Sequence, residues 1–78
     1  PDIMVSVSTI APNSKVPDRP HKHESHEMLY VKRGNVKISV GQDTKEVKNG
    51  DFIVFEPYEE HYLTTGEDEL VLLEVFWK

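Results

Sequence analysis

The chain has 78 residues, so we expect one small domain, residues 1–78, whose core is marginal unless bound metal or self-association adds to it. A formal net charge of -5, with no long run of Lys or Arg, argues against nucleic acid or an anionic membrane as the main partner. The absence of cysteine excludes disulfides and thiolate metal sites, and it agrees with the cytoplasmic location that we expect. No apolar stretch is long enough to span a bilayer.

The first twenty residues divide into a strand and a loop. Alternating residues predict a half-buried strand over Ile3–Ile10, with Ile3, Val5 and Val7 on one face and Ser6 and Ser8 on the other. Residues 11–20 contain three prolines among other turn formers, so we expect a loop there.

The rest of the chain is a series of short strands separated by turns. The turns centre on Gly34, Gly41 and Gly66, and Asn49–Asp51 is a hairpin-type signal. The predicted strands are Met28–Lys32, Val36–Val40, Thr44–Lys48, Phe52–Phe55, His61–Thr65 and Leu70–Trp77. No segment has convincing helical periodicity, so the pattern predicts an all-β sandwich or barrel.

Two of these segments are apolar on both faces. Leu29 and Val31 alternate with Met28 and Tyr30, and Phe52–Phe55 has no polar residue. A sheet in so small a domain can bury one face against its own core, so the other must meet a partner. We expect a homodimer, and a covering N-terminal arm is the alternative.

Four side chains form a candidate metal site. His21 and His23 share one face of a strand, so their imidazoles can converge. Glu27 on the next strand and His61 from a distant strand would complete a ligand set of three nitrogens and one oxygen, which suits a divalent transition metal. This demands a turn between His23 and Glu27, and it requires two strands separated by thirty-odd residues to be neighbours. His26 falls outside the pattern, and we interpret it as a turn or surface residue, with a role as an alternative ligand as the second interpretation. The simpler alternative for the whole set is that these histidines are ordinary surface residues.

The same residues resemble the two motifs of the cupin superfamily. The segment His21-x-His23-x-x-x-Glu27, followed by Gly34, is similar to the first motif, and Gly50–His61 is similar to the second. The interior of the second motif departs from the family pattern, because the usual proline falls on Glu56 and the usual glycine falls on Tyr58. The Asn that often follows is Thr65, and the glycine that often opens the first motif is Lys15.

The resemblance implies a small double-stranded β-helix, or jelly-roll barrel, that is often dimeric and holds its metal in the barrel mouth. The ligands would be His21, His23, Glu27 and His61, and the metal would be one ion of iron, manganese, nickel, zinc, copper or cobalt. Positions left open on such a metal would take a small oxygen-bearing molecule, which favours a metal-dependent dioxygenase, isomerase or lyase.

Two other functions stay open. The fold also resembles the small-ligand sensor domains of transcriptional regulators, and a metal-binding protein without turnover is the third reading. A sensor would require this chain to be a fragment. The chain begins at Pro1 rather than Met and shows nothing like a signal peptide, so a processed protein and a piece of a longer one are both compatible with it.

No catalytic residue is evident beside the metal. We expect Tyr62 to point outward and Leu63 to line the pocket, and Glu74 to be an outward charge on an edge strand. Tyr58 is balanced between pocket and surface. The candidate general acids or bases are Tyr30, Tyr58, Tyr62, Glu56, Glu59 and Glu60.

Overall fold

The computed structural model describes residues 3–21 and 25–78, with backbone alone for residues 17–21. Every regular element in this part of the chain is a strand. In chain order the strands are β1 (Ile3–Ile10), β2 (Lys15–His21), β3 (His26–Arg33), β4 (Asn35–Val40), β5 (Asp43–Lys48), β6 (Phe52–Phe55), β7 (His61–Thr65) and β8 (Leu70–Trp77). The described residues contain no helix long and apolar enough to cross a membrane.

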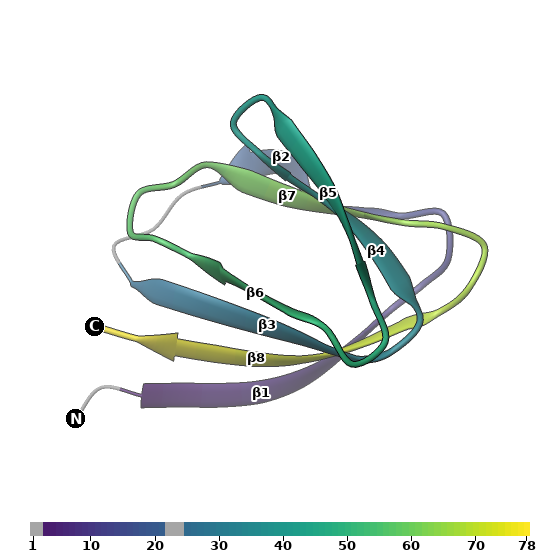
Figure 1. Cartoon of the computed structure of the whole chain (residues 1–78), viewed down its shortest axis with the longest axis horizontal. Helices are drawn as coiled ribbons and strands as arrows, with labels where there is room; N and C mark the ends of the chain where they lie inside the picture. The colour runs from purple at the N-terminus through teal and green to yellow at the C-terminus, as the bar shows by residue number, and fades with distance from the viewer. Residues whose placement is uncertain (1–2, 22–24) are drawn as a thin grey trace.

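The strands form two antiparallel sheets that face each other. One sheet has the order β1-β8-β3-β6 and the other the order β2-β7-β4-β5. Figure 1 shows them as two layers, with β1, β8, β3 and β6 below and β2, β7, β4 and β5 above. This is the strand order of a jelly roll, so the predicted all-β barrel is confirmed.

The core lies between the two sheets. Its fully buried members alternate along their strands with residues of higher exposure, as the period of two in a strand requires. The buried apolar residues are Leu29, Val31, Val36, Ile38, Val47, Phe55, Leu63, Leu70 and Leu72. Leu63, which was predicted to line the pocket, is buried in the core. Tyr62 was predicted to point outward, and it is half-buried with the Lys15 Nζ 4.4 Å from its ring centre.

Strand β1 has the opposite orientation to the one expected for a half-buried strand. Val5 and Val7 are 59% and 57% exposed, whereas Ser6 and Ser8 are half-buried. In the register of β1 with β8, Ser8 lies opposite the buried Leu72, so the serines face the interior. The apolar residues of β1 therefore join the solvent side of its sheet.

We call this solvent side the outer face. It is the surface of the sheet β1-β8-β3-β6 that points away from the second sheet. Its members are Ile3, Val5, Val7, Met28, Tyr30, Phe52, Val54, Leu73 and Val75. Phe52 is 63% exposed and Val54 is 42% exposed, so the outer face presents apolar area from β6 as well as from β1.

The prediction of a loop over residues 11–20 was wrong in its second half. The loop ends at Ser14, and β2 begins at Lys15 and runs to His21 despite Pro17 and Pro20. Strand β2 is the edge of its sheet and pairs only with β7, with a register shift between Val16 and His21. An edge strand tolerates proline because one of its sides needs no hydrogen-bond donors.

Two of the predicted turns carry the chain from one sheet to the other. Gly34 has a φ of 94° and connects the end of β3 to the start of β4. The turn at Asn49–Asp51 forms, but it does not make a hairpin, because β5 and β6 belong to different sheets. It is held instead by backbone hydrogen bonds in which Gly50 N donates to Val31 O and Val31 N donates to Asp51 O.

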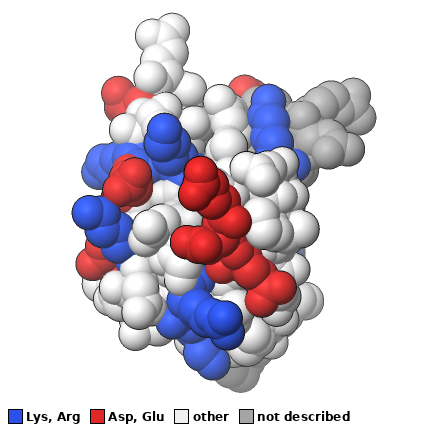
Figure 2. Space-filling view, turned by 90° about the vertical axis from the view of Figure 1, so that its right-hand side faces the viewer, with Lys and Arg blue, Asp and Glu red and all other residues white. Residues whose placement is uncertain are grey.

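Charged side chains of both signs lie side by side on the end of the molecule seen in Figure 2. Acidic groups cross the middle of this view and basic groups flank them, so the described atoms of this face form no continuous basic patch.

Candidate metal centre

Glu27 and His61 meet in the interior from opposite sheets. Glu27 is the second residue of β3, where it lies opposite Phe55 of β6 and Phe76 of β8. His61 is the first residue of β7, in the other sheet. The prediction that these two strands are neighbours in one sheet was wrong. Strands β3 and β7 belong to different sheets and face each other across the barrel interior. The start of β3 and the start of β7 both lie toward the left of Figure 1.

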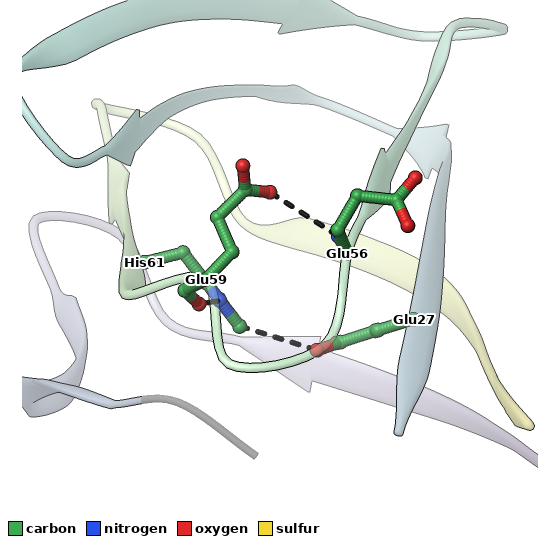
Figure 3. Close-up of polar contacts among 4 residues, drawn as sticks. All are labelled: Glu27, Glu56, Glu59 and His61. Carbon is green, nitrogen blue, oxygen red and sulfur yellow. Dashed lines mark hydrogen bonds and ion pairs between the residues drawn. The ribbon is translucent and has the colours of Figure 1, made fainter. Parts of the chain in front are cut away.

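The two side chains are buried and within contact distance. His61 Nε2 lies 3.2 Å from Glu27 Oε1, and the exposed fractions of the side chains are 4% and 7%. On its other side the imidazole Nδ1 lies 2.8 Å from the Glu59 carbonyl oxygen (Figure 3). That carbonyl can only accept, so Nδ1 carries a proton and donates it. Nε2 is then the atom that faces the carboxylate.

An aromatic ring fixes the plane of the imidazole. The Phe55 and His61 rings are stacked with centroids 4.0 Å apart and an interplanar angle of 7°. Phe55 has no solvent exposure. The stack and the hydrogen bond to Glu59 together hold the ring in one orientation. Its position opposite Glu27 on the neighbouring strand brings Phe55 to the imidazole.

The surroundings of His61 act on its pKa in opposite directions. Burial lowers the pKa of His61, but the hydrogen bond to the Glu27 carboxylate, the hydrogen bond to the Glu59 carbonyl and the negative charges of both residues outweigh it. The result is a pKa of His61 above its ordinary value of 6.5. The pair thus attracts positive charge to the space between Nε2 and Oε1.

The other two predicted ligands are placed only in part. The backbone of His21 lies opposite His61 in the pairing of β2 with β7, which brings the two residues to neighbouring strands. The side chain of His21 and the whole of His23 lie outside the described residues. Among the side chains that are described, no third carboxylate or imidazole joins Glu27 and His61 in a cluster that could hold a metal.

The described pair fits a metal ion in its chemistry. With its proton on Nδ1, neutral His61 presents the Nε2 lone pair to a carboxylate oxygen, and two lone pairs at 3.2 Å require a proton or a cation between them. Histidines that ligate metals commonly donate their second nitrogen to a backbone carbonyl, as His61 does to Glu59. Glu27 and His61 therefore fit as ligands of a divalent transition metal.

His26 does not belong to this site. It was expected to be a turn or surface residue. It is the half-buried first residue of β3 and neighbours Glu27, so it points to the outer face. There its ring stacks on Trp77 with centroids 5.3 Å apart, and its Nε2 lies 3.7 Å from a Glu56 carboxylate oxygen. This orientation turns His26 away from Glu27 and His61.

The candidate acids and bases of the loop before β7 face mainly outward. Tyr58 is 65% exposed and has a φ of 64°, so it is a surface residue. The Glu59 side chain accepts a hydrogen bond from the Glu56 backbone N–H (Figure 3), and Glu60 is exposed. Glu59 acts on the site through its carbonyl, and the sequence signal for that is only its position two residues before His61.

The expectation for Glu74 was wrong. Strand β8 lies between β1 and β3 rather than at an edge, and Glu74 lies opposite the buried Leu29. Its side chain therefore points to the interior. There Glu74 Oε2 accepts hydrogen bonds from the hydroxyls of Ser6 and Ser8, at 3.1 and 3.3 Å.

Comparison with known proteins agrees with this fold. The conserved SPY1581 protein of unknown function from Streptococcus pyogenes superimposes with a TM-score of 0.89 at 23% identity, over 100% of this chain and 66% of that one. The DMSP lyase DddQ from Ruegeria pomeroyi gives 0.88 at 16% identity, over 97% and 38%. At these identities the likeness shows the fold alone.

One curated relative is similar in sequence. An uncharacterized HTH-type transcriptional regulator of Bacillus subtilis (strain 168), YisR, is 37% identical over 43 residues, which is 55% of this chain and 15% of the regulator. The chain thus spans just under two thirds of the first solved structure and a small part of this regulator.

The family is settled by a match that covers most of the chain. Residues 6–76 match the model of the Cupin domain, which includes both motifs and all eight strands in whole or in part. The chain belongs to the cupin family.

Proposed function

We propose that this cupin domain binds one divalent transition-metal ion through Glu27 and His61, joined by His21 and His23, and uses it to act on a small oxygen-bearing molecule. The observation that supports the proposal most is the buried pair itself. A carboxylate oxygen and an imidazole nitrogen lie 3.2 Å apart in the interior, and the second imidazole nitrogen is already held by a backbone carbonyl.

Each described residue has a role in this proposal. His61 contributes Nε2 as a neutral donor because Glu59 holds the proton on Nδ1. Glu27 contributes negative charge to balance the cation, and Phe55 keeps the imidazole plane fixed and water away from it. A bound divalent ion would supply Lewis-acid chemistry toward an oxygen atom of the small molecule. Cleavage with dioxygen, isomerisation and lyase reactions are the reaction classes that we propose for it.

Elemental analysis of the purified protein tests the metal. We expect about one equivalent of a transition metal in the wild type, and a loss of most of it in His61→Ala and in His23→Ala. His26→Ala is the matched control, because it removes the remaining histidine, which faces outward against Trp77. Metal content that is the same in His61→Ala and His26→Ala, with both variants folded by circular dichroism, would refute the site.

A sensor domain is the second candidate function, and the similarity to YisR favours it. That protein is described as an HTH-type transcriptional regulator, and it is much longer than this chain. The open reading frame that encodes the chain discriminates between the two functions. DNA-binding helices next to the barrel would support a sensor, whereas turnover of a small molecule by the metal-loaded protein would support an enzyme.

A metal-binding protein without turnover is the third candidate function. Such a protein would take up metal and would convert no substrate.

We also propose that the outer face packs against a second copy of the chain. Its four strands, spaced about 4.8 Å apart and rising about 3.3 Å per residue, give a surface on the order of 500 Å² in projection. Apolar patches of that size mark interaction sites. Strand β1 adds an edge that carries neither charge nor proline from Ile3 to Ile10, and such an edge is open to pairing. A two-fold axis would match this face with itself.

Sedimentation equilibrium tests the dimer. We expect the wild type to sediment as a dimer and Val5→Asp to sediment as a monomer. Val5 is 59% exposed on the outer face, and the substituted aspartate would place a charge in the contact. Lys45→Asp, on the other sheet, is the control and should leave the mass unchanged. A monomeric wild type, or a dimer that survives Val5→Asp, would contradict the proposal.

A further inference from the structure

The interior wall formed by β1 and β8 is polar where a core would be apolar. Ser6, Ser8 and Glu74 all face the space between the sheets. Their neighbours on the same wall, Leu29 and Leu72, are buried core residues. A charged group on such a wall is costly unless hydrogen bonds or a ligand compensate it. The wall therefore departs from the packing rule at one place, and such departures are expected at functional sites.

This polar wall is next to the candidate metal centre. Glu74 lies opposite Leu29, and Glu27 is two residues before Leu29 on the same face of β3. Diagonal neighbours of this kind on antiparallel strands have Cα atoms about 7–8 Å apart. The Glu27 and Glu74 side chains therefore start from diagonal positions on the same interior face of the sheet.

The Glu74 carboxylate is oriented from one side. Both serine hydroxyls donate to Oε2, at 3.1 and 3.3 Å. Among the described residues, no group donates a hydrogen bond to Oε1. Glu74 is also half-buried rather than fully buried. The wall offers an oriented acceptor.

We propose that Ser6, Ser8 and Glu74 form the second half of the ligand site, and that Glu74 binds a hydrogen-bond donor on the small molecule whose oxygen atoms meet the metal. This inference rests on the proposed metal site. The ligand class is a small molecule with metal-binding oxygens at one end and a hydroxyl or ammonium group at the other. A second carboxylate is disfavoured at that end, because Glu74 and Glu27 would both repel it.

Three isosteric carboxylates test the proposal. Pentanoate, 4-hydroxybutyrate and 4-aminobutyrate differ only in a terminal methyl, hydroxyl or ammonium group. Each is titrated into the zinc-loaded, ¹⁵N-labelled protein, and its dissociation constant is measured from amide chemical shifts. We expect a compound with a donor end to bind about tenfold or more tightly than pentanoate, since a hydrogen bond to a charged group contributes that much. A gain for the hydroxyl compound assigns a neutral ligand, and a gain for the ammonium compound alone assigns a cationic one.

Variants of the wall decide the role of Glu74. Glu74→Leu should abolish the preference for a donor end. Glu67→Leu, which removes a carboxylate from an exposed turn, should leave the preference unchanged. The double variant Ser6→Ala, Ser8→Ala keeps the charge but removes its orientation, so the preference should weaken without disappearing.

The outcomes separate this inference from the metal site. A wild type that takes up no zinc would refute the proposed function and this inference with it. A zinc-loaded wild type that binds the three compounds equally, or binds none of them, would refute this inference alone. The same holds if the preference survives in Glu74→Leu.

Discussion

Replacing Gly34 by alanine tests how tightly the turn between β3 and β4 packs against the start of β8. A Cβ atom at Gly34 would lie 2.6 Å from the backbone oxygen of Glu69 and 3.4 Å from the Cα of Leu70. Ordinary contacts begin at 3.4 Å, so the first contact is too short by 0.8 Å (3.4 minus 2.6). Both atoms belong to the backbone and cannot rotate away, so the turn or the start of β8 must move.

The cost of the substitution has two parts. The φ of 94° at Gly34 lies in the left-handed region, which costs a residue with a Cβ roughly 1–2 kcal/mol. Forcing extra atoms into a packed site costs about 1–3 kcal/mol more. Gly41→Ala is the matched control, because Gly41 also has a positive φ, 58°, but a Cβ there would meet nothing within 4 Å. The control carries the first part only.

Thermal and urea denaturation of the two variants, at one protein concentration, measure the difference. Each kcal/mol lowers the melting temperature of a domain of this size by about 4–8 °C. We therefore expect Gly34→Ala to melt at least about 5 °C below Gly41→Ala. The gain from a stiffer unfolded chain is the same in both variants and cancels. Equal melting temperatures would refute the argument from close packing.

Three further predictions follow from the site and its loop. The first concerns the metal-free protein in EDTA. The raised pKa of His61 contributes stability that is complete below the ordinary value of 6.5 and is lost as the pH rises through the folded pKa. The melting temperature should therefore be higher near pH 6 than near pH 8.5, and His61→Gln should flatten that profile. In metal-loaded protein, chelation should lower the melting temperature, and an unchanged value would mean that the ion is peripheral. Tyr58→Gly should stabilise the protein by about 0.5–1 kcal/mol in urea denaturation, because it removes a side chain from a φ of 64°, whereas Tyr62→Gly in β7 should destabilise it.

The positions of most strands could be predicted because alternation and turn residues are local signals. The segments Phe52–Phe55, His61–Thr65 and Leu70–Trp77 coincide with β6, β7 and β8. The strand β2 could not be predicted, because its prolines exclude it from the middle of a sheet but not from an edge, and the edge is a property of the whole fold.

Alternation also defines two faces without saying which one points inward. For β1 the apolar face was expected inside, and the structure places the serines there instead. Glu74 was misjudged for the same reason, since its position between β1 and β3 depends on pairings with residues more than forty positions away.

For the site, spacing was enough to single out Glu27 and His61, but not to place them. They meet across the interior rather than along one sheet, and this follows from the jelly-roll order, which no local pattern encodes. The resemblance to the second motif predicts a glycine at Tyr58, and the φ of 64° there is a conformation that glycine adopts at no steric cost.

Because Glu27 and His61 come from opposite sheets, an ion between them would be coordinated by both layers of the sandwich. The ion could then dissociate only when the two layers separate, so the dissociation rate of the metal would measure how often the barrel opens transiently.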